Sequence, residues 1–229
     1  MASIRENLSK IQDRIAVAAD RSGQNPHSVC LVAVSKTKPV DLILEAIDAG
    51  ITDVGENRVQ EANSKRDQIN RSVRWHLVGH LQTNKVKQAL QIFDLIHSVD
   101  SLRLLAEIDR RSAQLGRQTD VLIQVNTSAE PSKYGIEPDQ TLNLIEASLD
   151  YTHVRIRGLM TIGVFLPNLE AVRPSFVLLR ELREKILAWQ FPGVEMEYLS
   201  MGMTNDFEVA IEEGANLVRI GTAIFGSRE

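Results

Sequence analysis

The sequence predicts an α/β fold, a single (β/α)8 TIM-type barrel with an additional N-terminal helix. Three observations support this prediction. Short apolar runs alternate with longer amphipathic stretches, about eight such runs can be counted, and no Pro-, Gly- or Ser-rich linker interrupts them. Alternating strands and helices indicate a parallel sheet, and eight strand–helix units close a barrel. An open doubly wound sheet is the alternative, because strand counts from one sequence are error-prone.

The elements follow from apolar spacing. An amphipathic first helix is predicted by residues spaced by four and three: Ile4, Leu8, Ile11 and Ile15. The first strand, 29–34, is apolar on both faces, as expected of a parallel strand covered by helices. The later strands are predicted at 53–55, 74–78, 95–98, 120–125, 154–159, 196–199 and 216–219. Helices are predicted to start near Val40, Arg58, Asn84, Ser101, Pro138, Leu169 and Asn205. We expect one domain, 1–229.

Composition excludes several classes of protein. The chain has 229 residues, 43% of them hydrophobic, which is enough for one large core. A formal net charge of -4 argues against a nucleic-acid-binding protein. Charged residues interrupt the N-terminal segment, and no apolar run approaches a membrane span. The single cysteine, Cys30, cannot form an internal disulfide, which suits a reducing compartment. We expect a cytoplasmic protein that binds neither nucleic acid nor membrane.

Lys36 is the second residue after the first predicted strand, in the segment SKTKP at 35–39. Functional groups of a barrel sit at the carboxyl ends of its strands, so this side chain would rise toward the mouth. Low-dielectric surroundings favour the neutral amine, which is the form that attacks a carbonyl group. A solvated rim lysine is the alternative, and Lys38 is the local rival.

Two loops rich in small residues follow the seventh and eighth predicted strands. They begin SMGMTND at 200–206 and GTAIFG at 221–226. In barrels, the loops at these positions frequently bind phosphate through backbone N–H groups and a short helix. Ser200 and Thr222 could add hydroxyl donors. Ordinary turns and helix caps use the same residue types, so the two loops together are the evidence.

Arg219 ends the eighth predicted strand, just before Gly221. An arginine buried at a barrel mouth stays charged and therefore needs a partner. Either a structural salt bridge or a hydrogen bond to a ligand atom, such as a pyridine nitrogen, would satisfy it.

Three further candidates lie at predicted strand ends. Asn57 is by default a helix cap, and otherwise orients an oxygen on a bound ring. His80 is a candidate for lining the pocket. A shared zinc with His76 is the alternative, but on a strand the two would lie about 13 Å apart at roughly 3.3 Å per residue. Met160 is expected to pack the floor of the mouth. We expect no metal site.

These residues fall within segments that resemble the pyridoxal-phosphate homeostasis protein family, which is related to the barrel half of bacterial alanine racemase. The matching segments are VAVSKTKP at 32–39, GENRVQE at 55–61, WHLVGHLQTNK at 75–85, RGLMTIG at 157–163 and SMGMTNDFEVAIEEGANLVRIGTAIFG at 200–226. They span nearly the whole chain in order, and the last is the most specific.

The resemblance implies that pyridoxal 5′-phosphate (PLP) is held as a Schiff base on Lys36. It implies that Arg219 faces the pyridine nitrogen, with Asn57 and His80 near the ring. The implied phosphate contacts are Ser200, Gly221, Thr222 and the backbone of Met201. With Met160 at the floor, these residues make up the expected cofactor site.

The expected role is a carrier or regulator of PLP rather than an enzyme. An arginine at the pyridine nitrogen does not transfer a proton to it. The pyridine ring then stays neutral, and the cofactor is a weaker electron sink. The resembled racemases add a tyrosine base from a second domain of the partner subunit, and the chain ends at Glu229 after the phosphate loop. We expect a monomer whose partners are PLP and, as recipients, PLP-dependent apo-enzymes or regulatory proteins. The alternatives are a weak amino-acid racemase or decarboxylase, and a purely protein-binding regulator.

Overall fold

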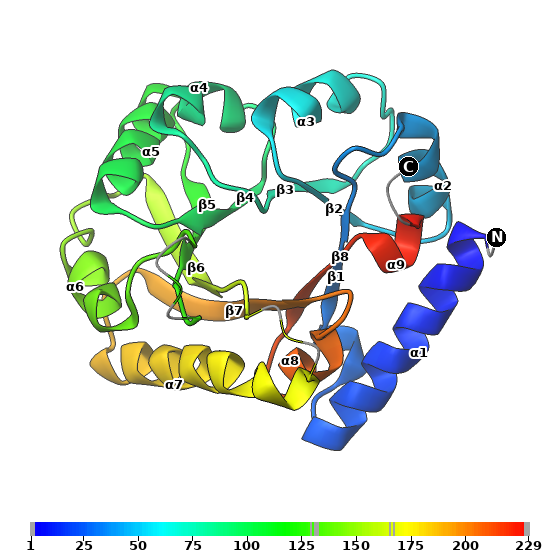
Figure 1. Ribbon diagram of the computed structural model, residues 1–229. Coiled ribbons are helices and arrows are strands. Elements are labelled where there is room, and N and C mark those ends of the chain that lie inside the picture. Colours follow the sequence, from blue (N-terminus) through cyan, green and yellow to red (C-terminus); the bar gives the residue numbers. More distant parts are fainter. Residues whose placement is uncertain (1–2, 129, 131–132, 165, 167, 227–229) are drawn as a thin grey trace.

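Eight parallel strands close into a barrel in the order β1 to β8, with helices around the outside (Figure 1). The computed structural model describes residues 3–128, 130, 133–164, 166 and 168–226. The strands are β1 Cys30–Val34, β2 Asp53–Glu56, β3 Arg74–Leu77, β4 Leu95–Val99, β5 Thr119–Gln124, β6 Val154–Met160, β7 Val194–Met203 and β8 Leu217–Ile220. The pairing of β8 with β1 closes the ring. The predicted barrel is therefore confirmed, and the alternative of an open sheet is wrong.

The helices between the strands begin close to the predicted positions. They are α1 Ile4–Ser22, α2 Val40–Asp48, α3 Val59–Arg66, α4 Val86–Ala89, α5 Leu102–Gln114, α6 Thr141–Glu146, α7 Arg173–Trp189, α8 Phe207–Glu212 and α9 Thr222–Phe225. Short 3-10 turns add η1 Pro26–Ser28, η2 Thr83–Lys85, η3 Pro138–Gln140 and η4 Leu169–Ala171. The helix expected to start near Leu169 is split into η4 and α7, and the proline of α7 lies in its first turn, where it is tolerated.

Two sets of apolar side chains form the core. The larger set lies between the strands and the surrounding helices. A separate cluster consists of Val32, Leu95, Leu122, Met160 and Leu217. Val32 pairs with Arg219 in the β1–β8 register, and paired residues of parallel strands point to the same face. This smaller cluster therefore fills the barrel interior on the side of Arg219.

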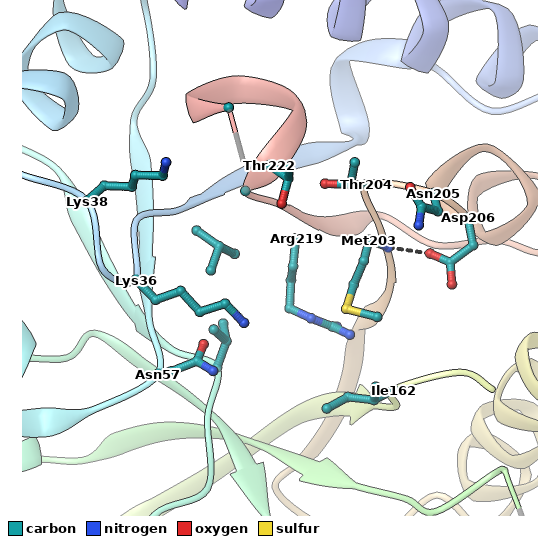
Figure 2. A pocket seen from close by; sticks show the side chains of 14 residues that line it. Lys36, Lys38, Asn57, Ile162, Met203, Thr204, Asn205, Asp206, Arg219 and Thr222 are labelled. Atoms are coloured by element: carbon teal, nitrogen blue, oxygen red, sulfur yellow. Dashed lines mark hydrogen bonds between the residues drawn. The ribbon is translucent and has the colours of Figure 1, made fainter. Parts of the chain in front are cut away.

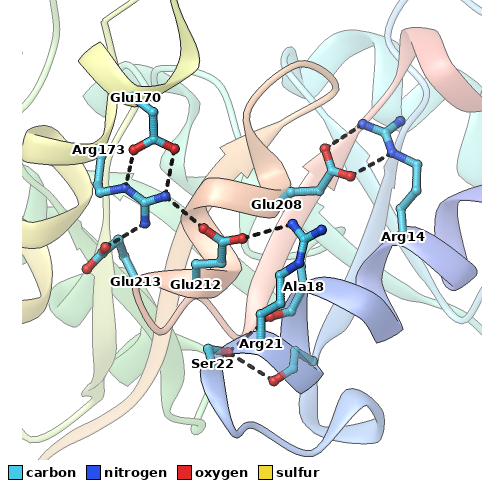
Figure 3. Close-up of polar contacts among 10 residues, drawn as sticks. Arg14, Ala18, Arg21, Ser22, Glu170, Arg173, Glu208, Glu212 and Glu213 are labelled. Carbon is cyan, nitrogen blue, oxygen red and sulfur yellow. Dashed lines mark hydrogen bonds and ion pairs between the residues drawn. The ribbon is translucent and has the colours of Figure 1, made fainter.

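Helix α1 packs against the barrel beside α8 and α9 (Figure 1). Its four predicted apolar residues are at most 6% exposed. A capping box between Ser3 and Glu6 starts the helix. Ion pairs from Arg14 to Glu208 and from Arg21 to Glu212 join it to α8, and Arg173 of α7 extends the network (Figure 3). Because exposed ion pairs contribute about 0–1 kcal/mol each, apolar burial is the main attachment.

Strand β7 differs most from the prediction, because it continues to Met203 rather than ending at Leu199. Ser200 and Met201 are fully buried, and Ser200 pairs with both neighbouring strands. Gly202 adopts a φ of 89°, and a Cβ there would lie 2.6 Å from the Cβ of Ala210. The small residues thus allow close packing within a strand, whereas the sequence pattern indicated a turn.

Among the residues that the structure describes, no helix combines the length and apolar character needed to cross a bilayer. The described side chains also include no group of three or more His, Cys, Asp or Glu that could hold a metal ion.

Candidate functional site

A cavity of about 250 Å³ opens at the carboxyl ends of the strands. This volume lies near the lower end of the range for small-ligand sites, roughly 300–1,000 Å³. Five of the predicted site residues line it: Lys36, Asn57, Arg219, Gly221 and Thr222. The structure therefore brings together residues at and beyond the carboxyl ends of β1, β2 and β8 that are up to 186 positions apart (222 − 36).

Lys36 extends into this cavity toward Arg219 and Asn57 (Figure 2). The residues on either side of it are held by a buried cluster. Lys65 Nζ donates to the carbonyl oxygen of Ser35 at 2.8 Å, and the Thr37 N–H donates to Glu61 at 2.5 Å. Thr37 has a φ of 63°, which is uncommon for a residue other than glycine. This backbone geometry is fixed on both sides of Lys36.

The centre of that cluster is Glu56, whose side chain is fully buried. Its Oε1 accepts from Lys65 Nζ at 2.7 Å and from Ser35 Oγ at 2.6 Å. Lys65 Nζ also donates to Glu61 at 2.7 Å. Burial raises the pKa of Glu56, although the hydrogen bonds from Lys65 and Ser35 oppose the rise. One ammonium group therefore joins α3 to the loop that carries Lys36.

Arg219 lies at the opposite wall of the cavity (Figure 2). Its Nη1 donates to Ser200 Oγ at 2.6 Å, and its Nη2 donates to the carbonyl oxygen of Thr161 at 2.7 Å. Burial lowers the pKa of the guanidinium to about 10, and Asp206 opposes the shift. Arg219 is therefore cationic at neutral pH, held at two of its nitrogens.

Two backbone segments form the rim next to Arg219. Gly221 precedes α9, and a Cβ at this position would lie 2.9 Å from the carbonyl oxygen of Val34. Glycine is therefore required for the close approach of β8 to β1. The second segment follows β7 and includes Thr204 and Asn205. Asp206 accepts from the Met203 N–H at 2.6 Å and fixes this turn, and burial raises its pKa despite that hydrogen bond.

Comparison with known proteins supplies the family. The model of the alanine racemase N-terminal domain matches residues 6–229. The pyridoxal phosphate homeostasis protein of Aquifex aeolicus is 44% identical over 225 residues, which cover 98% of each chain. The pyridoxal phosphate homeostasis protein of Escherichia coli K12 is 41% identical over a match that covers all of this chain and 98% of the relative.

The chain belongs to the pyridoxal phosphate homeostasis protein family. Solved structures agree with this assignment. PipY of Synechococcus elongatus, solved with PLP bound, superposes with a TM-score of 0.86 at 35% identity, covering 98% of this chain and all of PipY. The alanine racemase of Clostridium difficile has a TM-score of 0.79 at 14% identity, covering 99% of this chain and 60% of the racemase, which shows a common fold.

Four predicted site residues of this family member do not line the cavity. Ser200, Met201 and Met160 have no exposed surface, and Met160 belongs to the interior cluster. His80 stacks on Tyr134 with ring centroids 4.0 Å apart, in a separate surface hollow. Ser200 reaches the cavity indirectly, through its hydrogen bond from Arg219. Direct cofactor contacts by these four residues stay predictions.

The cavity is also lined by Lys38, the local rival of Lys36, and by residues that the sequence did not single out: Val34, Val78, Ile162, Met203, Thr204, Asn205, Asp206 and Gly226. The loop at 200–206 was expected to bind phosphate, but its contacts were assigned to its first two residues. Because β7 ends at Met203, the part of the segment that reaches the mouth lies three to four residues later. Recognising SMGM as strand would have added Thr204 and Asn205 to the expected site.

Proposed function

We propose that this protein binds PLP by a Schiff base on Lys36 and acts in PLP homeostasis as a carrier or regulator. One observation carries the proposal: a single small cavity joins the Lys36 side chain to the cationic Arg219 and to two loops with small residues. The family relatives named for PLP homeostasis and the PLP-bound PipY structure support it.

The residues present fit this cofactor. Lys36 supplies an amine inside the cavity, and Arg219 supplies a charged donor at the opposite wall. Gly221 and Thr222 begin a short helix whose first backbone N–H groups are suited to an anion. When bound, PLP would supply a reactive aldehyde. The protein would hold the cofactor: Lys36 would bind its aldehyde carbon, the rim segments would bind its phosphate, and Arg219 would orient its ring.

Titration of the purified protein with PLP tests the anchor. We expect a visible Schiff-base absorbance band in the wild type and in Lys87→Ala, an exposed control on α4, and none in Lys36→Ala. The variant Lys38→Ala tests whether Lys38, rather than Lys36, forms the Schiff base. A band that persists in Lys36→Ala and disappears in Lys38→Ala would assign the anchor to Lys38 and contradict the proposal.

The absence of turnover is part of the proposal. Among the described residues that line the cavity there is no tyrosine, the residue that would supply a racemase's second base. We expect the loaded protein to reactivate a PLP-dependent apo-enzyme. We also expect no protein-dependent interconversion of L- and D-amino acids and no decarboxylation. Steady turnover in proportion to protein concentration would establish the enzyme alternative instead.

The assembly state and cellular location belong to the same proposal. We propose a monomer in the cytoplasm, with PLP-dependent apo-enzymes or regulatory proteins as recipients. Light scattering of the loaded protein at several concentrations tests the monomer. A mass that corresponds to a dimer at all concentrations would contradict it.

A further inference from the structure

A continuous chain of hydrogen bonds crosses the barrel interior behind Arg219. His76 Nε2 lies 2.8 Å from Asp53 Oδ1, and His76 Nδ1 lies 2.9 Å from His97 Nε2. His97 Nδ1 lies 2.9 Å from Ser200 Oγ, which accepts from Arg219 Nη1 at 2.6 Å. Five side chains from five different strands are thus linked in series. Three of them (His76, His97 and Ser200) have no exposed surface.

The two ends of this chain set the direction of its hydrogen bonds. Arg219 can donate but not accept, and an ionised carboxylate can accept but not donate. Burial raises the pKa of Asp53, but hydrogen bonds from His76 and Thr52 outweigh it and leave the pKa below its usual value. Asp53 is therefore the terminal acceptor, with Arg74 as a further cation at 3.7 Å.

One assignment of protons satisfies every bond. The Ser200 hydroxyl donates to His97 Nδ1, His97 Nε2–H donates to His76 Nδ1, and His76 Nε2–H donates to Asp53. Both imidazoles are then neutral and carry their proton on Nε2. The opposite direction would require an imidazolium at His76. It would also leave the Ser200 hydroxyl proton without an acceptor among the described residues, because Ser200 Oγ would accept from both Arg219 and His97. Burial lowers the pKa of His97 well below its usual value, which favours the neutral imidazole there.

We propose that Asp53, His76, His97 and Ser200 form a positioning array for Arg219. Every donor in the array points away from the cavity, so Ser200 always offers Arg219 a lone pair. This fixes the guanidinium and leaves its remaining N–H groups for a ring nitrogen of a bound ligand. The role of the array in orienting a cofactor rests on the proposed function, whereas its proton arrangement does not.

The proton arrangement can be measured without any cofactor. Nitrogen-15 NMR of the histidine side chains in the apo-protein reports which ring nitrogen carries the proton. We expect His76 and His97 both to be neutral and protonated on Nε2, and Ser200→Ala to change the Nδ1 signal of His97. Protonation of His97 on Nδ1, or an imidazolium at either residue near neutral pH, would overturn the proposal.

The effect on the site is tested with the PLP-loaded protein. We expect Ser200→Ala to shift the absorbance maximum and to speed PLP dissociation about tenfold, roughly the value of one hydrogen bond to a charged group. Ser98→Ala is the matched control, because Ser98 is 1% exposed and its buried hydroxyl has no partner among the described residues. Wild-type spectrum and dissociation in Ser200→Ala would overturn the proposal.

His97→Phe distinguishes the array from a direct contact between Ser200 and the cofactor. This substitution keeps a buried ring but removes both of its nitrogens. The array predicts a spectral shift in the same direction as in Ser200→Ala, whereas a direct contact by Ser200 predicts the wild-type spectrum and would overturn it. If the loaded wild type showed no band at all, the proposed function would fail while the NMR result on the apo-protein still decided the array.

Discussion

Replacing Lys65 with methionine should destabilise the fold strongly, although Lys65 does not line the cavity. The substitution keeps most of the side-chain volume but removes the ammonium group. It leaves Glu56, which has no exposed side-chain surface, with Ser35 Oγ as its remaining hydrogen-bond donor among the described residues. Breaking a buried ion pair by removing one partner costs about 3–5 kcal/mol. That is a large part of the roughly 5–15 kcal/mol that stabilises a typical domain.

The pH dependence of this loss has a definite sign. Without Lys65, the pKa of Glu56 should rise further above its unfolded value, because burial is no longer opposed by a cation. A raised folded pKa gives stability that is present in acid and lost as the pH rises through that pKa. The difference between wild type and Lys65→Met should therefore be larger at pH 8 than at pH 5.

Urea unfolding provides the assay. Lys87→Met is the matched control, since Lys87 is exposed on α4 and its replacement should leave the midpoint almost unchanged. The double variant Lys65→Met/Glu56→Gln should recover much of the lost stability, because a neutral amide needs no cation. A loss below about 1 kcal/mol at pH 8, or no recovery in the double variant, would refute the reasoning.

Three other predictions concern the cavity rim and the single cysteine. Asp206→Ala frees the Met203 N–H, so PLP retention in equilibrium dialysis should weaken about tenfold; unchanged retention would contradict a role in fixing that turn. Gly221→Ala forces β8 away from Val34, so urea unfolding should show a loss of about 1–3 kcal/mol, and a wild-type midpoint would be inconsistent with the contact. Burial raises the pKa of Cys30 to about 12, so its thiolate is scarce at pH 8. Iodoacetamide should alkylate the native protein much more slowly than the urea-unfolded protein, and equal rates would disprove this protection.

Much of the fold could be predicted because short, largely apolar runs alternate with amphipathic helices along the chain. The prediction that this strand ends at Leu199 was wrong, because Ser200 and Gly202 are residues typical of turns. Here Gly202 lets β7 pack closely against α8, and the buried hydroxyl of Ser200 bonds His97 and Arg219. A local pattern does not distinguish these two uses of small residues, since the difference depends on what packs against them.

The site residues that could be predicted lie at or just after the carboxyl end of a strand, as Arg219 and Lys36 do. The residues that support them could not be predicted. Lys65 is 29 positions from Lys36 in the chain, and its contact with Glu56 depends on how α3 packs. His76 was weighed as a metal ligand with His80, but its partner is His97 on the neighbouring strand. Such pairs depend on register between strands, which one sequence does not reveal.

Borohydride reduction followed by peptide mass mapping tests the central claim most directly. The purified wild-type protein is incubated with PLP, reduced, digested and sequenced by mass spectrometry. The account predicts that the visible band disappears and that one peptide carries a pyridoxyl group on Lys36. A reduced adduct on another lysine, or a protein that stays colourless and unmodified, would contradict it.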